Sequence, residues 1–104
     1  MGLPPYRLAD FGTTFSTRPR AAELRDELIA ASPGLDAVVI DCNGVLSVSY
    51  SFADEFVGQL ADERKVKVSW INASPEVERV LERAIANRRG TLKTTASSPA
   101  LTYL

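Results

Sequence analysis

The apolar positions along the chain form two alternating kinds of pattern, short extended runs and longer helix-like repeats. Extended runs cover 6–11, 36–41 and 65–71, and a shorter one over 45–49 fits either a strand or an extended loop. In 36–41 the apolar residues are consecutive, which is typical of a central strand buried on both faces between parallel neighbours. In 65–71 apolar and polar residues alternate, which predicts a strand with one exposed face.

Three further segments repeat apolar residues at the spacing of an amphipathic helix. They cover 19–31, 52–62 and the stretch that follows Ser74, where serine and then proline form a strong helix start signal. Ser51 directly precedes the second of these segments and is the predicted N-cap.

The alternation of strands and helices predicts a single α/β domain over residues 1–90. We expect a mixed sheet of four or five strands with about three helices, mainly on one face. The polar, turn-rich segment 91–104 is predicted to be a tail or one additional edge strand.

Composition narrows the classes of function. For a chain of 104 residues, a formal net charge of −1 gives no reason to expect nucleic acid or an anionic membrane as a ligand. It contains no histidine and one cysteine, Cys42, so a histidine base, a zinc site and an internal disulfide are not expected, and no cofactor is predicted. The absence of a signal-peptide core and of a long apolar segment predicts a cytoplasmic protein.

Candidate chemistry concentrates in 37–58. There an apolar strand ends in Asp41, a tight Asn43-Gly44 turn follows, and the serine-rich segment 47–51 leads into a helix. An aspartate at a strand end and a serine at a helix start are both functional candidates, and they indicate different functions.

Three blocks of sequence carry a family resemblance. Residues 15–21 are F-S-T-R-P-R-A, residues 38–48 are V-V-I-D-C-N-G-V-L-S-V, and residues 51–56 are S-F-A-D-E-F. With these blocks the chain resembles, over roughly 11–89, the bacterial STAS-like domain family of unknown function. Through that family it is similar to anti-sigma factor antagonists.

The resemblance implies a non-enzymatic regulatory domain that binds a protein partner with a histidine-kinase-like ATP-binding fold. In the antagonists, a serine just before the corresponding helix is phosphorylated by that kinase. Ser51 and Ser49 are therefore the phosphorylation candidates, although the aspartate and glycine of the antagonist signature are replaced here by Ser49 and Phe52. The predicted partner-binding residues lie in the serine-rich loop or on the face of the next helix that we expect to be exposed: Ser47, Ser49, Tyr50, Ser51, Asp54, Glu55 and Gln59.

A phosphate on Ser51 would have two opposing electrostatic effects. The free amides of a helix N-terminus favour an anion, whereas Asp54 and Glu55 would repel it. Phosphorylation is therefore predicted to loosen the loop and to act as a release switch.

Asp41 supports two alternative hypotheses. The segment 41–46, D-C-N-G-V-L, resembles the first motif of haloacid-dehalogenase-type phosphatases, in which the first aspartate attacks phosphate. Asn43 stands where that family has its acid/base aspartate, so such a phosphatase would be degenerate. A small ligand bound at the strand ends near Asp41 is the other alternative. The structural interpretation of Asp41 is a hydrogen bond into the Asn43-Gly44 turn.

Overall fold

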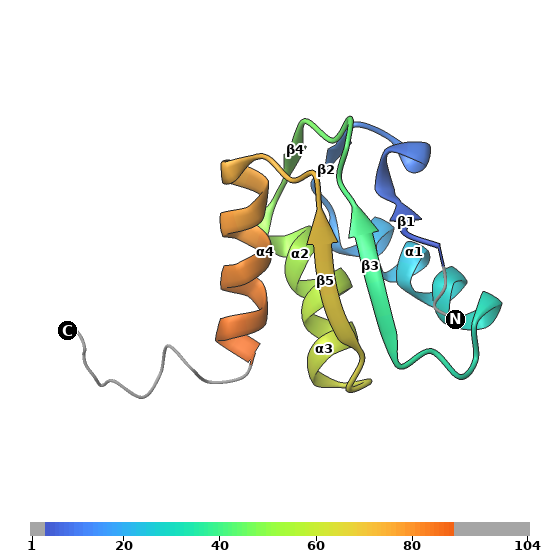
Figure 1. The fold of residues 1–104 in the computed structure, drawn as a ribbon. Helices are drawn as coiled ribbons and strands as arrows, with labels where there is room; N and C mark the ends of the chain where they lie inside the picture. The colour runs from blue at the N-terminus through green and yellow to red at the C-terminus, as the bar shows by residue number, and fades with distance from the viewer. Residues whose placement is uncertain (1–3, 89–104) are drawn as a thin grey trace, which may run out of the picture.

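The computed structural model describes residues 4–88 (Figure 1). Its strands and helices alternate as the sequence predicts, except for a 3₁₀-helix over 8–11 and a strand over 14–15, which the apolar pattern does not predict. The strands are β1 (Tyr6–Arg7), β2 (Thr14–Phe15), β3 (Ala37–Asp41), β4 (Ser47–Val48) and β5 (Lys67–Ile71). The helices are the 3₁₀-helix η1 (Leu8–Phe11), α1 (Arg18–Ala31), α2 (Tyr50–Ala53), the π-helix η2 (Asp54–Gly58), α3 (Gln59–Asp62) and α4 (Pro75–Arg88). The predicted tail or edge strand over 91–104 lies outside the described residues.

The strands form two small parallel sheets, so the expectation of one mixed sheet of four or five strands is wrong for the described residues. One sheet has the order β1-β3-β5 and the other pairs β2 with β4. The expected strand over 6–11 is only two residues long. Pro4 and Pro5 precede it and cannot donate to a ladder, and η1 follows it at once.

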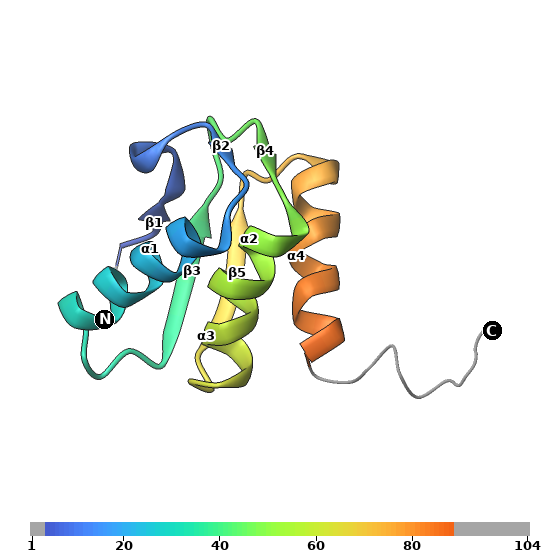
Figure 2. The same cartoon turned by 180° about the vertical axis from the view of Figure 1, so that it is seen from behind.

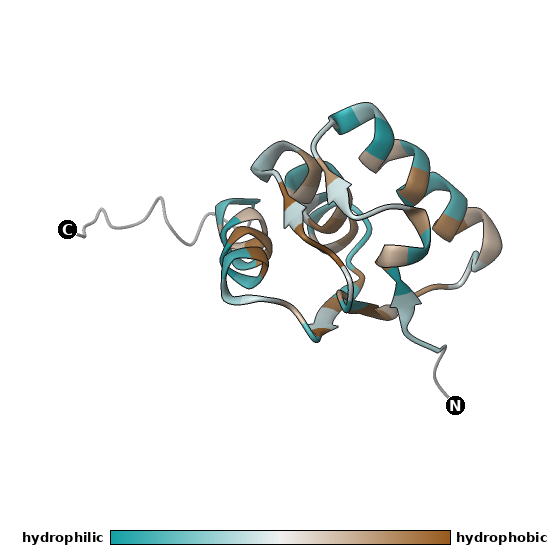
Figure 3. Ribbon diagram, turned by 90° about the horizontal axis from the view of Figure 1, so that it is seen from above, coloured by the Kyte–Doolittle hydropathy of each residue, from teal (hydrophilic) through white to brown (hydrophobic). Residues whose placement is uncertain are grey.

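The helices lie on one face of the β1-β3-β5 sheet, as expected. Figure 1 looks onto the uncovered face and Figure 2 onto the helices, and Figure 3 shows apolar residues gathered between the layers. Val38 and Ile40 of β3 point toward the helices and are buried, whereas Ala37 is exposed and Val39 is half-buried. The expectation that β3 is buried on both faces is therefore wrong within residues 4–88.

The segments α2, η2 and α3 form one continuous helix over 50–62, here called the middle helix. Its buried apolar residues come in pairs that recur every four positions: Phe52 and Ala53, Phe56 and Val57, Leu60 and Ala61. An α-helix completes a turn in about 3.6 residues, so such a row would drift around it. The wide turn of η2, in which the amide of Gln59 bonds the carbonyl of Asp54, keeps the row facing the core.

The middle helix lies between α1 and α4, and in Figure 2 all three lie in front of the sheet. α4 begins where predicted, because the hydroxyl of Ser74 accepts a hydrogen bond from the amide of Val77 at 3.2 Å. Its apolar stripe buries Val77, Leu81 and Ala84 against the middle helix. Both neighbouring helices therefore contact the element that follows the serine-rich loop.

Candidate functional site

The serine-rich loop is held by the pairing of β4 with β2. The amide of Ser49 donates to the carbonyl of Phe15 at 2.8 Å, which aligns the starts of α1 and the middle helix. The hydroxyl of Ser49 donates to the carbonyl of Ser16 and accepts from the amide of Phe52, each at 3.0 Å. Ser49 is therefore the N-cap, and the prediction that Ser51 caps the helix is wrong because the helix begins at Tyr50.

The other polar residues of the loop lie at or near the surface, whereas Val48 is buried. Ser47 is exposed, and Ser51 is half-buried at the second position of the helix. The ring of Tyr50 is 37% exposed, its hydroxyl accepts a hydrogen bond from Asn87 Nδ2 at 2.7 Å, and the guanidinium of Arg83 lies 6.0 Å from the ring centroid. Ser47, Tyr50, Arg83 and Asn87 form what we call the serine-loop surface.

Asp54 is not on an exposed face of the helix, contrary to the sequence-based expectation. It is only 9% exposed, because the middle helix lies between α1 and α4. Arg18 Nη1 of α1 donates to Asp54 Oδ2 at 2.8 Å. Arg88 of α4 donates through Nε to Oδ1 at 2.8 Å and through Nη2 to Oδ2 at 3.2 Å. We call Asp54, Arg18 and Arg88 the Asp54 clamp.

Glu55 and Gln59 are half-buried, so they too differ from the expected exposed face. Arg25 of α1 donates through Nη1 to Glu55 Oε2 at 2.7 Å and to the backbone carbonyl of Glu55 at 2.9 Å. Arg18 also lies 3.5 Å from Glu55 Oε1. The acidic pair of the helix thus joins it to its neighbours, and α1 contacts the backbone of the wide turn directly.

The electrostatics of the clamp favour an ionised carboxylate. The hydrogen bond from Arg88 lowers the pKa of Asp54, and burial opposes this effect only in part; the bond from Arg18 lowers it further. The same contact raises the pKa of Arg88. All three groups therefore stay charged at neutral pH.

Gly58 provides the space for Arg88 to reach Asp54. A Cβ atom on Gly58 would lie 3.2 Å from Arg88 Cγ and 3.2 Å from Asp54 Oδ1. The sequence shows a glycine inside a helix, but only the packing shows that it faces a guanidinium from another helix.

Asp41 has the structural role that the turn hypothesis predicts. Its Oδ1 accepts hydrogen bonds from the amide of Asn43 and from Asn72 Nδ2, each at 3.0 Å. These bonds, the one from Asn72 first, lower the pKa of Asp41. Among residues 4–88 no three His, Cys, Asp or Glu side chains gather as a metal site would require.

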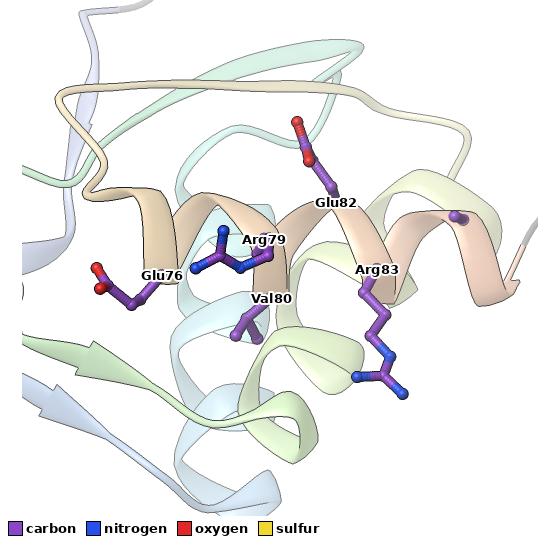
Figure 4. Close-up of a pocket in the computed structure, with 6 residues that line it drawn as sticks. Glu76, Arg79, Val80, Glu82 and Arg83 are labelled. Carbon is purple, nitrogen blue, oxygen red and sulfur yellow. The ribbon is translucent and has the colours of Figure 1, made fainter.

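Two hollows border α4. One, of about 350 Å³, is lined by Tyr50, Asp54, Asp62, Asn87 and Arg88 and connects the serine-loop surface to the Asp54 clamp. The other, of about 590 Å³, is lined by Glu76, Arg79, Val80, Glu82, Arg83 and Ala86 (Figure 4). All six residues of the second hollow come from α4, so it is a shallow surface and not an enclosed pocket.

Comparison with known proteins places the chain at the family level. The model of the STAS-like domain of unknown function, DUF4325, matches residues 20–78, which include most of α1, the serine-rich loop, the middle helix and β5. Neither a curated protein nor a solved structure matches the chain. None of the helices within 4–88 is long and apolar enough to cross a membrane.

Replacing Asp54 by asparagine tests the clamp. Asp54→Asn should lower the free energy of unfolding by about 3 kcal/mol, because it leaves two guanidinium groups without their carboxylate. The matched control is Asp62→Asn, since Asp62 lies 3.9 Å from Arg88 and is 32% exposed. The control should change the free energy by no more than about 0.5 kcal/mol. Equal effects in urea denaturation would contradict the assigned role of Asp54.

A methyl group at Gly58 tests the packing around Arg88. Gly58→Ala should lower the free energy of unfolding by about 1 kcal/mol, because crowding of Arg88 outweighs the better helix propensity of alanine. Gly34 is the control, since a Cβ there meets nothing within 4 Å. We expect Gly34→Ala to be neutral or slightly stabilising. Thermal denaturation measures both, and a stabilised Gly58→Ala variant would disprove the close contact.

Proposed function

The chain belongs to this STAS-like family of unknown function, and we propose that it is a regulatory protein–protein interaction domain that acts by binding and not by catalysis. The observation that carries the proposal is the position of Tyr50. An aromatic ring stands partly exposed between the serine-rich loop and α4, where Asn87 and Arg83 fix its orientation. We propose the serine-loop surface as the partner-binding site.

Two physical properties support this site. Tyrosine and arginine are enriched among the residues that dominate binding energy at interfaces. A side chain that is already held in place loses little entropy when a partner binds. Tyr50, with its hydroxyl on Asn87 and its ring beside Arg83, has both properties, and exposed Ser47 extends the surface toward the loop.

We further propose that phosphorylation of Ser51 regulates the site. Both hydroxyl interactions of Ser49 serve the fold, so Ser51 is the stronger candidate of the two serines. A phosphate on Ser51 would lie in the first helical turn, three and four residues before Asp54 and Glu55. It would add a charge of about −1.5 to −2 beside the clamp and change the surface that a partner meets.

The proposed partner is a histidine-kinase-like ATP-binding protein of a bacterial cytoplasm, as the similarity to anti-sigma factor antagonists suggests. The decisive assay is binding of this chain to each such protein encoded in the source genome, measured one at a time by calorimetry. Mass spectrometry of the chain from its native host should detect a phosphopeptide that covers Ser51.

Tyr50→Ala should weaken binding to the cognate partner by at least about tenfold, as expected for a central aromatic contact. The control is Phe11→Ala, because Phe11 is 40% exposed and lies next to Tyr6 of β1, outside the serine-loop surface.

Ser51→Asp should also change the affinity of the chain for the cognate partner. Unchanged binding of Tyr50→Ala would contradict the site, and unchanged binding of Ser51→Asp would contradict the switch. Magnesium-dependent phosphate release that Asp41→Asn abolishes would contradict the non-catalytic role.

A further inference from the structure

The uncovered face of the β1-β3-β5 sheet is unusual for parallel strands. Parallel sheets occur almost only where other elements cover both faces. Within residues 4–88 the helices cover one face, and Figure 1 shows the other in full view. Ile71 on the uncovered face is 42% exposed, and Ala37 is exposed as well.

The register of the strands defines which side chains share this face. Val39 stands beside Ser69 in the middle row, and Ala37 stands beside Lys67 at the amino ends of the strands. At the carboxyl ends the row consists of Arg7, Asp41 and Ile71. The face is thus apolar along β3 and at the end of β5, with charges at its two ends.

The amino end of the face carries a lysine, and the carboxyl end carries an aspartate beside an arginine. Lys67 is exposed and has no ion-pair partner among residues 4–88. Asp41 lies on the next strand, four residues further along, which corresponds to about 13 Å in an extended strand. A copy of the face turned end to end therefore brings its Asp41 to the same end as Lys67 of the first copy, on the neighbouring strand.

We propose that this face is the interface of a homodimer, in which a second copy of the chain covers the sheet. The two-fold axis runs across the strands through the row of Val39 and Ser69. The two sheets then stack face to face with antiparallel strands, about 10 Å apart. The stem of Lys67 covers Ile71 of the second copy, and its ammonium reaches the second copy's Asp41 on the neighbouring strand.

Charge complementarity favours a second copy over an unrelated partner. The two-fold axis forms the Lys67–Asp41 pair twice, once at each end of the face. It also brings Val39 of one copy over Val39 of the other. Arg7 already has an ion-pair partner in Asp10, 3.3 Å away. The dimer also supplies the second buried face that the consecutive apolar residues of β3 require.

The interface is distinct from the serine-loop surface, which lies on β4, α2 and α4. A dimer would therefore carry two partner-binding sites. This inference does not depend on the proposed function, and its test needs no partner.

Sedimentation equilibrium of the purified chain measures the proposed dimer directly. Three short strands provide a small interface, so we expect a weak dimer that dissociates at micromolar concentrations. Ile71→Lys should raise the dissociation constant by at least about tenfold, because it forces an ammonium group into the apolar part of the interface. Lys67→Glu should weaken the dimer as well, and by more at low salt than at high salt.

The matched control is Leu46→Lys, the same kind of change at an apolar residue that is 74% exposed and lies outside this sheet. It should leave the dimer intact. Circular dichroism spectra identical to wild type will show that the Ile71→Lys and Lys67→Glu monomers are folded; should one variant unfold, the other serves alone. A wild-type chain that stays monomeric up to about 1 mM would overturn the proposal. A dimer that Leu46→Lys breaks and Ile71→Lys spares would overturn it too.

Discussion

A single buried carboxylate, that of Asp54, joins the three helices of this domain. Guanidinium groups reach it from both sides, Arg18 from α1 and Arg88 from α4. A buried charge is tolerated only when it is paired and hydrogen-bonded, so the three helices must keep the spacing that completes these bonds. Because Asp54 lies one turn after Ser51, the same constraint fixes where the serine-rich loop stands.

The π-helical turn and the clamp depend on each other. Apolar residues that recur every four positions drift slowly around an α-helix, and the wide turn that begins at Asp54 reduces this drift. Arg25 donates to the carbonyl of Glu55 within that turn, and Gly58 leaves room for Arg88 beside it. The five residues of η2 (Asp54–Gly58) therefore pack against the sheet and also contact both α1 and α4.

The sequence predicts best what local patterns determine. The helices over 18–31 and 75–88 and the strands β3 and β5 follow from apolar spacing and from capping residues that act over one turn. The apolar pattern predicts Ser51 as the N-cap, whereas the N-cap is Ser49. Both serines stand near the start of the same apolar row, and what distinguishes Ser49 is its hydroxyl, which accepts from the amide of Phe52 and donates to the carbonyl of Ser16. The prediction that Asp54 is exposed fails for a different reason. Its arginine partners lie 36 and 34 positions away, and no local pattern connects such distant charges. The apolar row takes about half of the helix, as in an ordinary amphipathic helix, so it gives no local sign that Asp54 is covered as well.

The most direct test of this account is an NMR titration of the side-chain carboxyl carbon of Asp54, in the wild type and in Arg88→Met. In the wild type the midpoint should lie below the value of about 3.9 for an unpaired aspartate, and Arg88→Met should raise it, because the bond from Arg88 is the largest cause of the lowered pKa. Since the pKa is lower in the folded state, the clamp stabilises the fold above the unfolded pKa and loses this contribution as pH falls through the folded one. A wild-type Asp54 that titrates at or above the ordinary value, with no change in Arg88→Met, would contradict the central role of the clamp.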